Sequence, residues 1–119
     1  MIVYRCEDTL ESVFTAIYQA YEEKRNHDDT LLSLTDDALL FAEDIPVTAD
    51  EEKTRKVMRT LVRRFGQEDS SRLIKALAAE DEGKAQAVYR TVVQGLRGKC
   101  RPGHLFDNLA DDDVHRAFA

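Results

Sequence analysis

Residues 2–21, IVYRCEDTLESVFTAIYQAY, join two contrasting patterns at the start of the chain. The first five of these residues are rich in β-branched and aromatic side chains, which favours a strand. From Leu10 onward the apolar residues recur every three or four positions, as on one face of a helix, and Asp8 or Thr9 can cap its first turn. A strand followed directly by a helix predicts a domain that mixes both kinds of structure. The predicted inward face of the helix holds Leu10, Val13, Phe14, Ile17, Tyr18 and Tyr21.

A second extended segment is predicted over residues 38–47, after a polar, Asp-rich connection at residues 26–37. Pro46 lacks a backbone donor, so we expect it at a sheet edge or at the end of a strand. If the two strands pair, the helix between them makes the crossover, and the strands should be parallel. Because a two-stranded sheet is weak alone, a third strand is expected, either from residues 38–47 split in two or from residues beyond 119.

Further helices are predicted in the second half of the chain. Thr48 and Glu51 match the capping box, and the helix that follows should run to Phe65 and stop at Gly66. Other helices should begin near residue 69, run from about residue 84 to 96, and begin near residue 112, with a short helical turn at residues 105–109. The predicted fold class is therefore α+β and mostly helical, with about four to five helices and a small sheet of two to three short strands.

The length of 119 residues is that of one ordinary domain, large enough to bury roughly two-thirds of its unfolded surface. No apolar stretch approaches the roughly 20 residues that span a bilayer, and acidic residues arrive too early for a signal peptide, so no membrane contact and a cytoplasmic location are expected. The helix near residue 112 has a start signal and no stop signal. We therefore expect residues 1–119 to be one domain, the N-terminal part of a longer protein cut inside that helix.

Residues suited to catalysis or metal binding are few. Cys6 and Cys100 each lack a second thiol or a His at metal-ligand spacing, so no metal, cofactor or iron–sulfur cluster is predicted, and both thiols are expected to be reduced. Asp111 and His115 could seed a metal site, but an Asp cluster before an apolar residue more often caps a helix. No nucleophile motif or glycine-rich phosphate loop occurs, so no catalytic residue is assigned.

Charge is distributed unevenly along the chain. Residues 1–50 hold twelve acidic and three basic side chains, whereas residues 51–104 hold seven acidic and thirteen basic ones. Although the net charge of the chain is −6, residues 51–104 therefore form a basic segment. Because salt screens charges over about 8 Å, a partner would feel this local basic surface more than the distant acids.

The candidate site is a basic face on the helix over residues 51–65, joined by the loop at residues 97–104. At about 100° per residue, four cations of this helix share a stripe opposite its apolar face. Such a face either contacts a phosphodiester backbone or is an ordinary solvated helix surface, and without interleaved aromatic residues it does not indicate base stacking. The predicted nucleic-acid-binding residues are Arg55, Lys56, Arg59, Arg63, Arg64, Arg97, Lys99 and Arg101.

The order of these segments resembles a known family. The strand ending at Cys6, LESVFTAIYQAY at residues 10–21, VVQGLR at residues 92–97 and NLADDDVHR at residues 108–116 are similar to the N-terminal half of the bacterial "probable DNA metabolism protein" family, a domain of unknown function. In that family the gene usually lies beside a radical-SAM protein assigned to DNA modification or repair, and some members are fused to a uracil-DNA-glycosylase-like module. The resemblance implies that any iron–sulfur cluster belongs to the radical-SAM partner, and it supplies no catalytic residues.

The basic face and the resemblance together predict an accessory domain of DNA modification or repair that contacts the nucleic-acid backbone. Two alternatives stay open. The chain could be an adaptor that docks a radical-SAM partner without touching DNA, or part of a DNA-base-processing enzyme completed by a missing C-terminal half. Salt-dependent DNA binding would favour the first interpretation over the adaptor.

Overall fold

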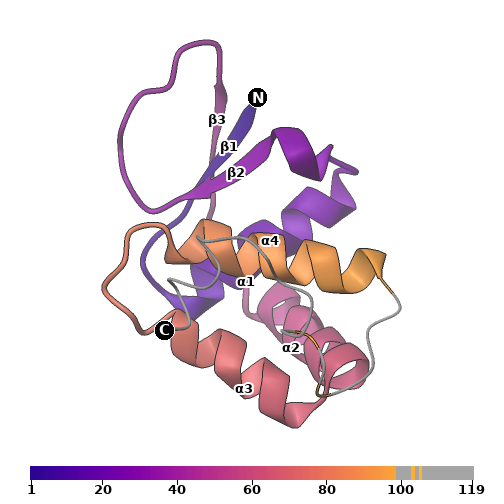
Figure 1. Ribbon diagram of the computed structural model, residues 1–119. Helices are drawn as coiled ribbons and strands as arrows, with labels where there is room; N and C mark the ends of the chain where they lie inside the picture. Colours follow the sequence, from indigo (N-terminus) through magenta and orange to yellow (C-terminus); the bar gives the residue numbers. More distant parts are fainter. Residues whose placement is uncertain (99–102, 104, 106–119) are drawn as a thin grey trace. The chain divides into compact units, whose positions relative to one another are not determined.

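The computed structural model describes residues 1–98, 103 and 105 (Figure 1). The chain divides into two compact units, Met1–Val57 and Met58–Ala119, which we call unit 1 and unit 2. The described residues form four α-helices and three strands, which confirms the predicted α+β, mostly helical fold class.

Unit 1 contains a parallel three-stranded sheet. β1 (Ile2–Arg5) lies in the centre, with β2 (Thr30–Ser33) on one side and β3 (Glu43–Pro46) on the other. The prediction of parallel strands is therefore confirmed. Pro46 ends an edge strand, as predicted, and there its missing N–H costs no ladder hydrogen bond.

The predicted positions of the outer strands were partly wrong. β2 lies inside residues 26–37, which were predicted to be a connection, whereas residues 38–42 contain no strand. Thr30 and Leu32 are buried on β2 and alternate with half-buried neighbours. With only four residues between Asp-rich stretches, the alternation of apolar and polar side chains is too short to predict a strand. Pairing with β1 stabilises these residues as the third strand.

α1 (Leu10–Glu22) follows β1 as predicted and is capped by Thr9, whose hydroxyl accepts from the N–H of Ser12 at 3.1 Å. It ends in a Schellman motif in which Lys24 has φ 54° and the N–H of Arg25 donates to the carbonyl of Ala20 at 3.0 Å. The prediction that Tyr21 lies in the core is wrong. Tyr21 is 37% exposed near the C-terminal end of α1, and its ring lies against the ring of His27.

α2 (Glu51–Phe65) ends where the sequence predicts, but its cap differs from the prediction. Asp50, rather than Thr48, accepts from the first turn, with Oδ1 at 3.0 Å from the N–H of Lys53. Asp50 is held in turn by Thr15 of α1, a buried residue whose hydroxyl accepts from the N–H of Asp50 at 2.9 Å. The contact with Thr15 across 35 positions selects the cap, and a local motif search cannot detect it.

This cap gives a direct test. Asp50→Ala is expected to lower the free energy of unfolding by about 0.5–2 kcal/mol, because the N–H of Lys53 loses its acceptor. Thr48→Ala, at an exposed position, should change it by less than about 0.5 kcal/mol. Urea denaturation followed by circular dichroism measures both. A larger loss for the Thr48 variant would restore the capping-box prediction.

Unit 2 contains the rest of α2, α3 (Gln67–Ala76) and α4 (Lys84–Arg97). Gly66, with φ 89°, ends α2 and serves as the N-cap of α3, so α3 begins two residues earlier than predicted. Asp69 is therefore a buried residue of the first turn rather than the start of the helix. The predicted helix near residue 112 and the turn at residues 105–109, except Leu105, lie outside the described residues.

Gly95 allows the end of α4 to approach the end of α2. A Cβ atom at Gly95 would lie 2.7 Å from Cζ of Phe65 and 2.4 Å from Cδ1 of Leu105, so only glycine fits without displacement. The N–H of Gly103 donates to the carbonyl of Phe65 at 2.9 Å, and the N–H of Leu105 donates to Oδ2 of Asp69 at 3.0 Å. The C-terminal ends of α2 and α4 therefore lie together.

Candidate nucleic-acid interface

The first group of cations on α2 is paired within unit 1. Arg55 Nη2 lies 3.3 Å from Glu51 Oε1, and Lys56 Nζ lies 3.8 Å from Glu52 Oε1, each one helical turn away. Such exposed pairs contribute only about 0.3–0.5 kcal/mol, but they place a carboxylate beside each cation. The aromatic ring of Tyr18 also lies 5.6 Å from Lys56 Nζ. Arg55 and Lys56 are thus predicted site residues whose charge is balanced locally.

The second group of cations lies on the part of α2 that belongs to unit 2. Arg59, Arg63 and Arg64 are exposed, and none makes an ion pair or side-chain hydrogen bond with another described residue. Arg59 and Arg63 are four positions apart, so they lie on the same face of the helix. Within the described part of the chain, the positive charge of their guanidinium groups is therefore uncompensated, and an anionic partner can reach it.

Arg97 occupies the last turn of α4 and is exposed. The packing of Gly95 against Phe65 brings the end of α4 to the end of α2, which carries Arg63 and Arg64. We call Arg59, Arg63, Arg64 and Arg97 the arginine cluster. Lys99 and Arg101, the remaining predicted site residues, lie outside the described residues.

The arginines of this cluster can also stabilise the C-terminal ends of α2 and α4 without binding any partner. Cations in the last turn of a helix offset the partial negative charge of its C-terminus, which is roughly half an elementary charge per helix. Arg63, Arg64 and Arg97 stand in the last turns of the two helices. Because Arg59, Arg63 and Arg64 carry three full positive charges against the partial negative charge at the end of α2, a positive field remains around the part of α2 that the structure describes in unit 2.

The ion pairs on the first half of α2 were not predicted from the sequence, although the spacing of the charged residues indicates them. Glu51 and Glu52 stand four residues before Arg55 and Lys56, the spacing and order that favour helical ion pairs. The convergence of Arg97 with the end of α2 has no such signal, because it depends on contact between residues 30 positions apart, Phe65 and Gly95.

Other candidate chemistry is weaker. Burial raises the pKa of the Cys6 thiol to about 12, so it is protonated at neutral pH and is a poor nucleophile. Among the described residues no group of His, Cys, Asp or Glu side chains could hold a metal ion. The metal candidates Asp111 and His115, and Cys100, lie outside the described part of the chain.

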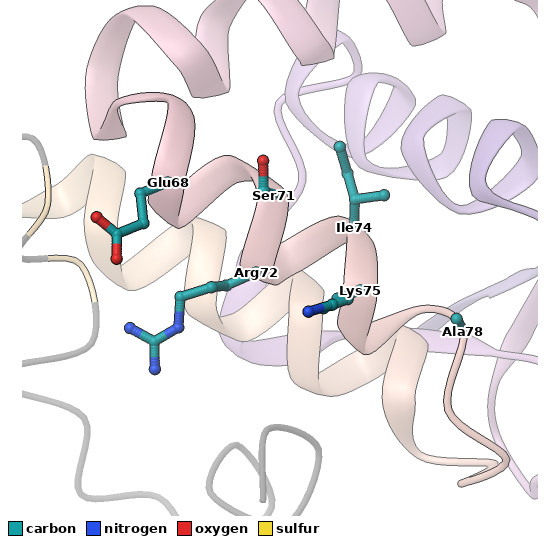
Figure 2. Close-up of a pocket in the computed structure, with 6 residues that line it drawn as sticks. All are labelled: Glu68, Ser71, Arg72, Ile74, Lys75 and Ala78. Carbon is teal, nitrogen blue, oxygen red and sulfur yellow. The ribbon is translucent and has the colours of Figure 1, made fainter.

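An open hollow lies against α3 (Figure 2). The described residues that line it come from α3 and from the residues just after it, and they are Glu68, Ser71, Arg72, Ile74, Lys75 and Ala78. Binding sites for small molecules usually need polar groups that converge from separate elements. The part of the hollow that the structure describes offers a single helix face, so the arginine cluster is the stronger candidate.

Comparisons with known proteins found no relative of this chain. No model of a known protein family matches the chain, no curated protein is similar to it, and no solved structure matches its fold. The resemblance described above therefore stays a prediction. Within the described residues, no helix has the length and apolar character needed to cross a membrane.

Proposed function

We propose that this chain is an accessory domain of DNA metabolism that contacts the nucleic-acid backbone through the arginine cluster. The observation that carries the proposal is the contrast along α2. Arg59, Arg63 and Arg64 have no acidic partner among the described residues, whereas Arg55 and Lys56 each have one. Guanidinium groups bind phosphate by paired, charge-assisted hydrogen bonds, and three or four of them at one helix end suit a polyanion.

The expected binding is weak and insensitive to sequence. Three or four phosphate contacts predict that the logarithm of the association constant falls with the logarithm of salt concentration at a slope of about −2.7 to −3.6. Affinity should then fall about 40- to 150-fold between roughly 50 and 200 mM salt. A dissociation constant between about 0.1 mM and 1 µM is expected, which fits a domain that assists a more specific partner.

Fluorescence anisotropy with a labelled DNA duplex, measured across salt concentrations, tests the proposal. The decisive variant carries Arg59→Gln, Arg63→Gln and Arg64→Gln. It should bind at least about tenfold more weakly at low salt, and its salt slope should fall to close to zero, or to about −0.9 if Arg97 contributes one contact.

The matched control carries Lys53→Gln, Arg55→Gln and Lys56→Gln, which remove the same charge from the same helix. Because these three cations already have acidic partners, this control should keep the salt slope within about one unit of the unchanged chain. Undetectable binding in low salt, or equal losses in the two triple variants, would contradict the proposal.

A further inference from the structure

A second surface with its own chemistry lies on unit 1, in the loop between β2 and β3. Leu40 and Phe41 are 88% and 96% exposed, more than any other large apolar side chain among the described residues. Phe41 also has φ 63°, a region that bulky residues adopt only under strain. An apolar pair held outside the core in a strained turn indicates a contact surface rather than a packing element.

Arg5 of the central strand holds this loop in place. Its guanidinium donates to the carbonyl of Thr35 at 2.9 Å and to that of Asp37, on the side of the loop that follows β2. It also pairs with Asp44 at 3.1 Å, on β3. One half-buried side chain thus ties both stems to the sheet, and the tip formed by Leu40 and Phe41 is preorganised.

Acidic residues surround the tip. Asp36, Asp37, Glu43 and Asp44 flank it on both sides and are exposed, and among these four only Asp44 has an ion-pair partner in the described part of the chain. We call these four residues the acidic collar. Their negative charge repels phosphate groups, so neither nucleic acid nor anionic lipid is expected to bind at the tip. The tip instead fits an apolar spot flanked by cations.

The chain itself carries a surface of that chemistry. Val62 is 38% exposed on α2, and the spacing of Arg59, Val62 and Arg63 places all three on one helix face. We propose that the chain self-associates through these two surfaces. Leu40 and Phe41 of one copy lie on Val62 of a second copy, and the acidic collar of the first faces Arg59 and Arg63 of the second.

The contact is smaller than a standard protein interface, so the association should be weak and reversible, with a dissociation constant on the order of 0.1 mM. It does not depend on DNA binding, because its energy comes from apolar contact and from charge complementarity between copies. If the proposed function also holds, DNA and a second copy compete for Arg59 and Arg63.

Sedimentation equilibrium of the 119-residue chain, at concentrations from about 10 µM to 1 mM, gives the first measurement. Association is expected at low salt, and it should weaken at least about threefold in roughly 0.5 M salt, because charge pairs at the rim are screened. A chain that stays monomeric at about 1 mM overturns the proposal.

Mixing two variants identifies the surfaces. The tip variant carries Leu40→Ser and Phe41→Asn, since asparagine tolerates a positive φ. The face variant carries Arg59→Glu and Arg63→Glu. Each alone should associate at least about tenfold more weakly than the unchanged chain, whereas an equimolar mixture should associate, because one keeps the tip and the other keeps the helix face.

The control variant, Arg55→Glu with Lys56→Glu, makes the same charge change on the same helix and should associate within about threefold of the unchanged chain. All substituted side chains are exposed, so circular dichroism should show native helix content. Should the charge reversal unfold the chain, Arg59→Gln with Arg63→Gln replaces it in the same mixing test. A face variant that associates alone as strongly as the unchanged chain, or a mixture that associates no better than either variant alone, overturns the proposal.

Discussion

Replacing Phe65 by alanine is expected to lower the free energy of unfolding by about 3–5 kcal/mol. The ring of Phe65 has no exposed surface and lies against Gly95, where no side chain is present to fill the space that the ring would leave. Total stabilities of small domains are about 5–15 kcal/mol, so this single change removes a large part of the total. Urea denaturation followed by circular dichroism gives the measurement.

Val62→Ala is the matched control for this prediction, since it removes apolar atoms from the same helix at an exposed position. It should cost less than about 1 kcal/mol. Because Phe65 joins α2 to α4, its loss should also separate Arg97 from Arg63 and Arg64 and weaken the DNA binding that we propose. Equal costs for the two substitutions would show that the ends of α2 and α4 are not held by this packing.

Alkaline pH is expected to destabilise the fold through Cys6. Burial raises the pKa of its thiol from 9.0 to about 12, so the folded state keeps a proton that the unfolded state loses above pH 9. The stabilising contribution is complete below pH 9 and is lost as the pH rises toward 12. At about 1.4 kcal/mol per pH unit, the loss approaches 4 kcal/mol over this range.

The comparison that isolates this effect uses two chains that both carry Cys100→Ser, one with Cys6 and one with Cys6→Ala. The free energy of unfolding is measured between pH 8 and 11 by urea denaturation. Burial also raises the pKa of Tyr4, but Tyr4 is present in both chains, so the difference between them reports on Cys6. Parallel stability curves would show that the Cys6 thiolate is tolerated in the folded state.

Much of the fold could be predicted because its signals are local. Thr9 as one of two possible caps of α1, the apolar repeat that follows, the stop at Gly66 and the edge position of Pro46 each depend on a few neighbouring residues. β2 could not be predicted, since four residues carry little pattern and their stability comes from pairing with β1. The cap at Asp50 was missed for a similar reason, because Thr15 selects it from another helix.

The candidate surfaces likewise include features that the sequence predicts and features that it does not. The basic stripe of α2 follows from helical geometry, and the pairing of Arg55 with Glu51 is readable from their spacing. The loop tip at Leu40 and Phe41 was predicted to be part of a strand, because apolar and aromatic residues favour strands wherever they occur. Its exposure depends on Arg5, which holds both stems of the loop from a strand more than 25 residues earlier.

By itself the sequence determined that this chain folds as a mostly helical α+β protein with a basic second helix, because periodicity, caps and charge order act over one or two helical turns. Only the tertiary structure decided that Arg97 lies near the end of α2 and that Leu40 and Phe41 face solvent. Both results come from contacts between residues distant in the chain, Phe65 with Gly95 and Arg5 with the loop, and such contacts leave no periodic trace in the sequence.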